Sequence, residues 1–129
     1  MKKQLSISES EWTVMKTIWK GPPKTLPDIL NSLAGTGWST TTIQTYLARL
    51  VKKGVLTTSR QGKGYLYYPA VSEEDCQLSE SRTFLHRVYD GSLSQMVKGF
   101  VKSGGLSEDE LNELKKIISE SEKTNADHL

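Results

Sequence analysis

The spacing of apolar residues changes at Gly54, and this change constrains the fold more than any other feature of the sequence. Before Gly54, apolar residues recur every three or four positions, which is the spacing of helices that bury one face. After it, residues 55–60 and 65–68 are rich in β-branched and aromatic side chains on either side of the glycine-containing segment 61–64, which is typical of a β-hairpin. The sequence therefore predicts short helices followed directly by a hairpin.

Two of these helices begin with the spacing of a capping box, in which two side chains each accept a hydrogen bond from a backbone amide at the helix start. Ser8 and Glu11 have this spacing, and so do Thr25 and Asp28. A third helix begins within residues 39–42. The expected buried faces of the three helices are, in order, Trp12, Met15, Ile18 and Trp19; Leu26, Ile29, Leu30 and Leu33; and Ile43, Tyr46, Leu47, Leu50 and Val51.

The third helix has an unusual composition at its start. Threonine is mediocre inside a helix but good at its beginning, and the run of residues 39–42 is Ser-Thr-Thr-Thr. A helix that enters the major groove of B-DNA places its N-terminal residues on the base edges. There, glutamine can pair with adenine, and threonine can bond to a base and contact the thymine methyl. Thr41, Gln44 and Thr45 lie on the expected exposed face, which predicts that they read bases.

Positive side chains and free helix amides are expected to contact DNA phosphates around this face. They lie further along the third helix, at the hairpin tip, and at the starts of the second and third helices. In that order, the candidates are Arg49 and Lys52, Arg60 and Lys63, and Thr25, Ser39 and Thr40. The alternative reading is an ordinary solvated helix face with no DNA function.

The charge is divided unevenly between the two halves of the chain. Residues 1–70 hold eight lysines and two arginines against three acidic residues, a net charge of +7. Residues 71–129 hold five lysines and two arginines against twelve acidic residues, a net charge of −5. A basic half joined to an acidic half suggests that the first meets a polyanion, although a gradient between two solvated surfaces would give the same numbers.

The acidic half is predicted to be helical, with breaks at Gly91 and Gly104-Gly105, and with a frayed tail from Glu122 to Leu129. Three short helices are too small for a good core, so packing against a second copy is the simplest arrangement and an isolated small bundle is the alternative. The expected dimerisation residues are Phe84, Leu85, Val88, Leu111, Leu114, Ile117 and Ile118.

The predicted fold class is mainly α with a small β-hairpin wing. A winged helix-turn-helix DNA-binding domain is expected over residues 1–70 and a helical dimerisation domain over residues 71–129. A dimer would place two reading heads about one helical turn of DNA apart, which matches a palindromic operator.

The sequence contains few residues that suit a catalytic role. His86 beside Arg87 is interpreted as a surface or interface residue, and Cys76 after three acidic residues as a structural thiol. No Cys/His cluster or phosphate-binding glycine motif is present, so no enzyme activity, metal or cofactor is predicted. There is no apolar run long enough to span a bilayer and no signal peptide, so we expect no membrane partner and a cytoplasmic protein.

Several tracts together resemble the BlaI/MecI penicillinase-repressor family over nearly the whole chain. The most specific runs from Trp38 to Gly54, and the others are Glu11 to Met15 with Ile18-Trp19, the Tyr67-Tyr68 hairpin, Phe84-Leu85, Val88 to Gly91, and Leu106-Ser107 through Leu114. The resemblance implies a homodimeric transcriptional repressor of resistance genes, such as a β-lactamase operon. It also implies base reading at Thr41, Thr42, Gln44 and Thr45, and dimerisation through the C-terminal helices.

The family also implies a release mechanism, from which this chain departs. In antibiotic-responsive members, a membrane sensor protease triggers cleavage of an Asn-Phe-like bond in the middle C-terminal helix, and the corresponding pair here is Gly99-Phe100. The Cys-x-Cys pairs of a copper-responsive branch are lacking. Two alternatives remain open: a winged-helix repressor that answers another signal, such as a small ligand or a metal, and a protein-interaction module without DNA binding.

Overall fold

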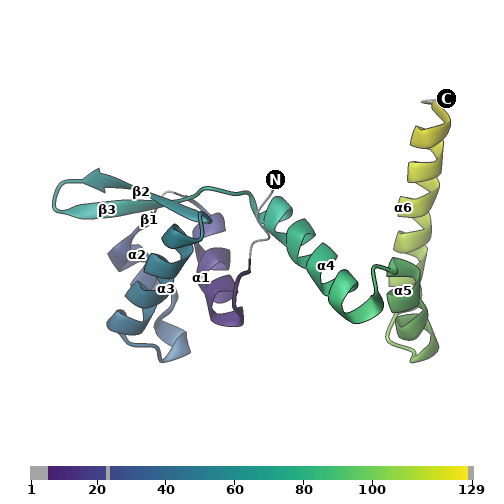
Figure 1. The fold of residues 1–129 in the computed structure, drawn as a ribbon, viewed down its shortest axis with the longest axis horizontal. Coiled ribbons are helices and arrows are strands. Elements are labelled where there is room, and N and C mark those ends of the chain that lie inside the picture. The colour runs from purple at the N-terminus through teal and green to yellow at the C-terminus, as the bar shows by residue number, and fades with distance from the viewer. Residues whose placement is uncertain (1–5, 23, 128–129) are drawn as a thin grey trace. The chain divides into compact units, whose positions relative to one another are not determined.

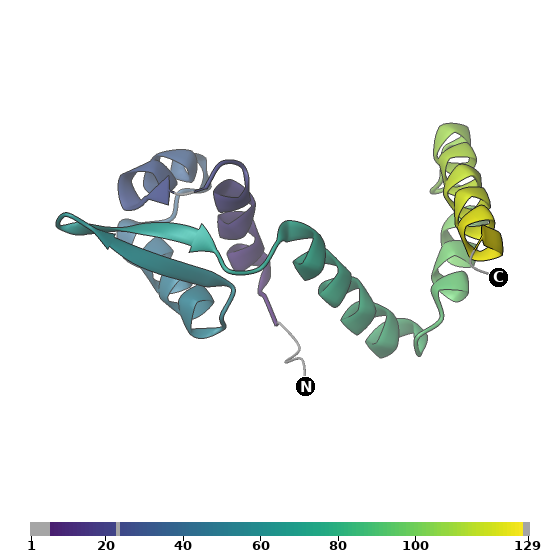
Figure 2. The same ribbon diagram turned by 90° about the horizontal axis from the view of Figure 1, so that it is seen from above.

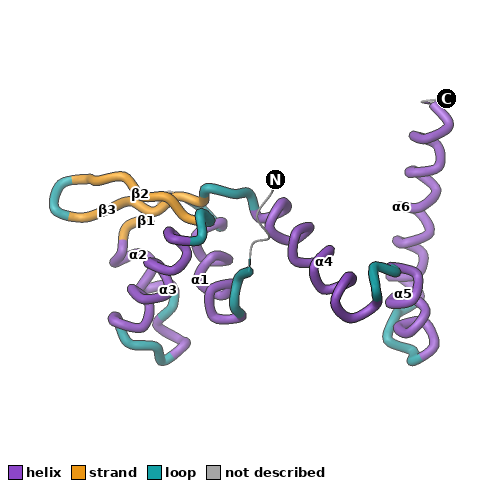
Figure 3. The backbone as a smooth tube through the Cα atoms, in the orientation of Figure 1, coloured by secondary structure: helices purple, strands orange, loops and turns teal. Residues whose placement is uncertain are grey.

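The computed structural model describes residues 6–22 and 24–127. Figure 1 shows the order of the elements, and Figure 3 shows where helices, strands and loops alternate along the backbone. The chain divides into two compact units, Met1–Thr83 and Phe84–Leu129. The first contains three α-helices, a short 3-10 helix, the sheet and the start of a fourth α-helix.

The helices of the first unit begin where their caps predict. Helix α1 spans Glu9–Trp19, and the Ser8–Glu11 capping box is fully formed. Helix α2 spans Leu26–Ser32, with the predicted box between Thr25 and Asp28. After the 3-10 helix η1 (Ala34–Thr36), helix α3 spans Thr40–Lys52 behind its cap, Ser39. These starts depend on bonds within four residues, which is why the sequence was sufficient to predict them.

The predicted hairpin is confirmed, and it belongs to a three-stranded antiparallel sheet with the order β1-β3-β2. Strands β2 (Leu56–Gln61) and β3 (Gly64–Pro69) form the hairpin. Strand β1, Lys24–Thr25, pairs with β3 and was not predicted, because two residues are too short to show an alternating pattern. In both views the hairpin extends beyond the helices of the first unit, which makes it the wing of the fold (Figures 1 and 2).

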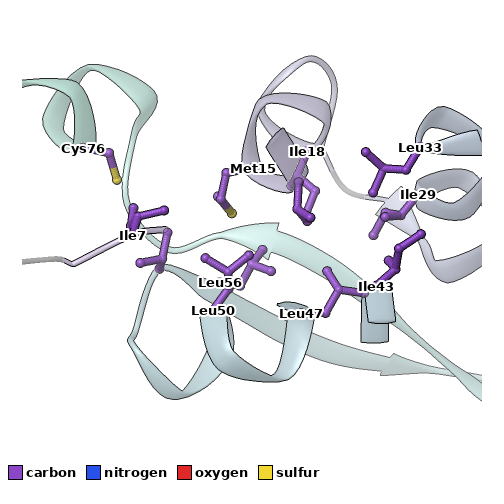
Figure 4. Close-up of a cluster of buried hydrophobic side chains, with 12 residues drawn as sticks. Ile7, Met15, Ile18, Ile29, Leu33, Ile43, Leu47, Leu50, Leu56 and Cys76 are labelled. Carbon is purple, nitrogen blue, oxygen red and sulfur yellow. The ribbon is translucent and has the colours of Figure 1, made fainter. Parts of the chain in front are cut away.

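The core of the first unit lies among α1, α2, α3 and the sheet (Figure 4). One predicted core residue is misplaced: Val51 is 39% exposed. It follows the buried Leu50 by one residue, and a helix turns about 100° per residue, so Val51 lies at the edge of the buried stripe. Helix α4 (Glu73–Tyr89) adds Cys76 to the core, and the Trp19 indole donates a 3.0 Å hydrogen bond to the Val71 carbonyl.

The second unit is built from the end of α4 and from α5 (Leu93–Lys102) and α6 (Glu108–Asp127). Ser107 caps α6 by accepting a 3.1 Å hydrogen bond from the Glu110 amide. The predicted frayed tail is wrong as far as Asp127, because α6 continues through it; residues 128–129 lie outside the described part. The polar residues from Glu122 onward can form an exposed helix, and only the apolar stripe of α6 ends before them, at Ile118.

Candidate nucleic-acid interface

The N-terminus of α3 is capped by Ser39. The Ser39 hydroxyl accepts a 3.1 Å hydrogen bond from the Thr42 amide, which fixes where the helix begins. One face of α3 is anchored in the core by Ile43, Leu47 and Leu50. The opposite face is therefore kept outside the domain on a rigid element, which is the arrangement that a reading helix needs.

Three of the four predicted base readers lie on this outer face. Thr41, Gln44 and Thr45 are exposed. The Thr45 hydroxyl donates to the Thr41 carbonyl at 3.0 Å, which leaves its oxygen and methyl group available to a partner. Among the described residues, the Gln44 side chain has no hydrogen-bond partner, so its amide oxygen and its NH2 group are both available for a base edge.

Thr42, the fourth candidate, is placed differently. It is half-buried, and its hydroxyl accepts a 3.0 Å hydrogen bond from the Ser39 hydroxyl. Its position lies at the edge of the outer face rather than at its centre. Thr42 and Ser39 thus form the cap of α3, and any contact of either with DNA would have to share these bonds.

Arg49 and Lys52 lie in the last turn of α3 and are both exposed. Within the described part of the chain, the side-chain ion pair that forms joins the next residue, Lys53, to Glu11. The charges of Arg49 and Lys52 are therefore not neutralised by neighbouring carboxylates, which suits contact with phosphates.

The wing places two more positive charges away from the core. Arg60 is in the last residues of β2, directly opposite Tyr65 on β3, and Lys63 lies in the two-residue turn after it. Gly62 in this turn has a φ of 60°, a left-handed conformation that glycine adopts without steric cost. The two charges lie at the tip of the hairpin, as the sequence predicted.

The expected phosphate position at Thr25 is already occupied by other groups. The Thr25 amide donates to the Asp28 carboxylate at 3.1 Å, and its hydroxyl accepts from the Asp28 amide at 3.3 Å. These bonds lower the pKa of Asp28, so a negative charge is held at the start of α2. The start of α3 carries no such carboxylate, which makes Ser39 and Thr40 the better placed pair for a phosphate.

The structure adds two features that sequence reasoning missed. Glu11 was expected only to cap α1, yet it is 1% exposed and pairs with Lys53 at the end of α3. This pairing joins residues 42 apart in the chain, and no local pattern indicates it. Tyr65 was expected only as a strand residue. Its position opposite Arg60 could have been found by counting outward from the two-residue turn.

Cys76 lies outside this face, and its surroundings do not activate its thiol. Burial raises the pKa of the Cys76 thiol, and the nearby charges of Asp75 and Glu80 raise it further, which opposes the reactive thiolate form. In the residues that the structure describes, no group of three or more His, Cys, Asp and Glu side chains could hold a metal ion. No helix in this part combines the length and the apolar character that crossing a bilayer requires.

A domain with an exposed third helix, a two-strand wing and basic residues on both is a winged helix-turn-helix domain. A family model described as penicillinase repressor matches residues 7–120. The chain belongs to the penicillinase repressor family, which is a family of transcriptional repressors and not of enzymes.

Two relatives show how far this similarity extends. The penicillinase repressor of Bacillus licheniformis is 41% identical over 121 residues, which cover 93% of this chain and 94% of the relative. The methicillin resistance regulatory protein MecI of Staphylococcus aureus (strain N315) is 35% identical over 118 residues, covering 91% and 96%. The similarity to both spans the two units, the acidic half included.

Two solved structures are similar to the first unit. The DNA-binding domain of the repressor BlaI has a TM-score of 0.52 at 42% sequence identity, covering 58% of this chain and 93% of that domain. The monomeric form of Bacillus licheniformis BlaI in complex with the blaP half-operator has a TM-score of 0.50 at 42% identity, with the same coverage. The fold class expected from the sequence is thereby confirmed.

Proposed function

We propose that this chain is a homodimeric repressor that binds a palindromic operator and controls a resistance operon, such as a β-lactamase operon. The observation that carries the proposal is the exposed N-terminal face of α3, with Thr41, Gln44 and Thr45 outside the core. A 42% identical domain that was solved on the blaP half-operator supports it. In this proposal residues 1–70 bind DNA, residues 71–129 dimerise, and the protein acts in the cytoplasm, where operator DNA lies.

Each part of the face has its own role on the duplex. The amide group of Gln44 pairs with a base, for which adenine is the best match, and Thr41 and Thr45 contact neighbouring base edges, with Thr42 at the margin. Phosphates are bound by the start of α3, by its last turn and by the wing, where charge rather than sequence determines affinity. These phosphate contacts are assigned to Ser39, Thr40, Arg49, Lys52, Arg60 and Lys63, with Thr25 as a weaker candidate.

Dimerisation through the second unit is supported by its lack of a core. Of its described side chains, from Phe84 to Asn125, none is buried. Apolar residues lie exposed on all three of its helices, and half-buried ones flank them. An isolated unit of this size would leave this surface in water, and covering it with a second copy is the simplest remedy. The proposed interface residues are Phe84, Leu85, Val88, Leu111, Leu114, Ile117 and Ile118.

Two routes of release are compatible with this unit. The Gly99-Phe100 bond lies in the last turn of α5, where a helix opens most easily, and a protease could bind it only after local opening. Glycine inside a helix lowers the cost of that opening by about 1 kcal/mol relative to alanine. The other route is a small ligand in the apolar groove between α5 and α6, which is lined by Val97, Phe100, Leu106, Glu110, Glu113, Leu114 and Ile117.

Binding to an inverted repeat of the blaP half-operator, compared with a random duplex of equal length, tests the proposal. A dimer with about 6–10 phosphate contacts loses about three to five decades of affinity between about 50 and 200 mM salt. A response to salt that stays flat would exclude DNA binding and leave only a protein-interaction module. Selection of bound fragments from genomic DNA then identifies the regulated genes. Binding sites that all lie away from resistance genes would contradict the proposed control of a resistance operon.

A further inference from the structure

The tip of the wing holds an arginine against an aromatic ring. Arg60 lies directly opposite Tyr65 in the ladder, one pair beyond the Gln61–Gly64 pair that closes the turn. In a two-residue hairpin this second pair is not hydrogen-bonded, and the side chains of such a pair lie closer together than those of a hydrogen-bonded pair. The Cζ atom of Arg60 is 5.9 Å from the centroid of the Tyr65 ring, which is within the range of a cation–π interaction.

The pair lies on the face of the hairpin that is turned to the helices. Side chains alternate along a strand, so Arg60 shares a face with Leu56, which is buried. Tyr65 likewise shares a face with Tyr67, which packs against the core. Unlike Leu56 and Tyr67, Tyr65 is 49% exposed, because the hairpin extends past the core there (Figure 2). Core packing therefore does not account for a large aromatic side chain at this position.

We infer that Tyr65 is a positioning residue for DNA binding: its ring holds the Arg60 guanidinium at the wing tip for contact with a phosphate. This inference rests on the proposed function. A long side chain loses rotamer freedom when it binds, and a ring that restricts it beforehand reduces that loss. Lys63, in the turn itself, makes no hydrogen bond or ion pair with another described side chain, so its charge acts without such a support.

Tyr65→Ala gives a direct test because it changes no charge. The expected result is an affinity for DNA that falls about two- to fivefold, which corresponds to an exposed cation–π pair. The dependence on salt should keep its slope, because Arg60 still reaches the phosphate. Arg60→Ala, in contrast, should lower that slope by about one, since a phosphate contact is lost. In the Arg60→Ala background, Tyr65→Ala should have no further effect.

Two further variants separate positioning from other roles of the ring. Tyr65→Phe keeps the ring without its hydroxyl and should restore the affinity lost in Tyr65→Ala. Ser59→Ala changes a small exposed residue on the opposite face of the same strand and serves as the matched control, with binding unchanged. Thermal unfolding of every variant shows whether the wing and its domain remain folded.

The outcomes are distinct. Equal losses in Tyr65→Phe and Tyr65→Ala would show that the hydroxyl itself contacts DNA and would overturn the inference. A Tyr65→Ala loss that persists without Arg60 would overturn it as well, because the ring would then act alone. Phosphate contacts do not depend on sequence, so the series is measured on the random duplex as well as on the blaP inverted repeat. If the wild-type protein bound the blaP inverted repeat no better than the random duplex, this would count against the proposed function. The test of Tyr65 would still hold, because it uses phosphate contacts that both duplexes offer.

Discussion

The Nζ atom of Lys53 lies 2.5 Å from Oε1 of Glu11, which ties the end of α3 to the beginning of α1. Glu11 is almost fully buried, and the Ser8 amide donates a second hydrogen bond to the same oxygen at 2.9 Å. A buried carboxylate is costly unless it is paired and hydrogen-bonded, and here Lys53 and Ser8 both bond to Oε1. The same contact joins α1 to α3, the helix that carries the proposed reading face.

Replacing Lys53 by methionine should destabilise the first unit by about 1–3 kcal/mol, because Glu11 is left buried without its counter-charge. The loss should stay below the roughly 3–5 kcal/mol of a fully buried pair, since the Lys53 side chain is 35% exposed. Urea unfolding measures it. Lys16→Met, at an exposed position of α1, is the matched control, and equal losses in the two variants would contradict the role of the pair.

Stability should fall on acidification through Glu11. Burial alone would raise the pKa of this carboxyl, but the hydrogen bonds and the charge of Lys53 and the bonds from Ser8 outweigh it and hold the pKa below its usual value of 4.5. The folded chain thus favours the ionised form, so this contribution is complete above pH 4.5 and is lost as the pH falls from there through the folded pKa.

The measurement compares urea unfolding of the wild-type protein and Glu11→Gln. The wild type should be the more stable at about pH 7, and the difference should shrink toward about pH 3. Asp28, whose pKa is also lowered, titrates in both proteins and therefore does not affect their difference. A difference that is independent of pH would show that the charge of Glu11 contributes nothing to stability.

Gln44→Ala should cost about 1–3 kcal/mol on the operator and relax the preference for one base pair. Gln44 is exposed, so the fold should be unaffected. Lys63→Ala is the comparison, and it should weaken operator and random DNA alike, because it removes a charge and no base contact. Competition between single-base variants of the operator measures the preference. Unchanged discrimination in Gln44→Ala would mean that another part of α3 reads the bases.

Leu114→Asp should convert dimers into monomers in analytical ultracentrifugation, because a carboxylate is placed in the apolar surface that the second copy is proposed to cover. Leu114 also lines the groove within the protomer, so Ile118→Asp is the cleaner variant, since Ile118 is 58% exposed. Lys115→Asp introduces the same residue at an exposed polar position of α6 and should leave the dimer intact. Dimers that persist in both Leu114→Asp and Ile118→Asp would exclude this interface.

Cys76 should react slowly with a thiol reagent in the folded protein and rapidly in denaturing urea. Its side chain is buried, and its pKa is raised by that burial and by the charges of Asp75 and Glu80. The reactive thiolate is therefore both shielded and disfavoured. The labelling rate followed across a urea titration should change together with the loss of helicity. Rapid labelling without urea would show that the start of α4 opens independently of the core.

Local bonds explain where prediction from sequence succeeded. The starts of α1, α2 and α3 depend on Ser8, Thr25 and Ser39, each of which bonds to an amide three residues away. The hairpin depends on a two-residue turn between β-forming segments. The exposure of Thr41, Gln44 and Thr45 follows from helical periodicity, since a residue opposite a buried stripe is exposed wherever the helix packs. Their role in reading bases stays a prediction.

Prediction failed where distant segments meet. Strand β1 exists only because β3 offers it a partner 41 or more residues away, and Val51 is exposed because the other elements cover a narrower stripe of α3 than its apolar residues span. Both outcomes depend on packing geometry, which a pattern along one helix does not contain.

The change of apolar spacing at Gly54, the helix caps and the charge division are properties of the sequence alone, because each depends on residues a few positions apart. They determined three capped helices, a basic-tipped wing and the exposed face of α3. Only the tertiary structure decided that Glu11 is buried against Lys53. It also decided that the second unit leaves its apolar side chains uncovered within one chain. The physical reason is that burial is shared between segments, so no single segment specifies it.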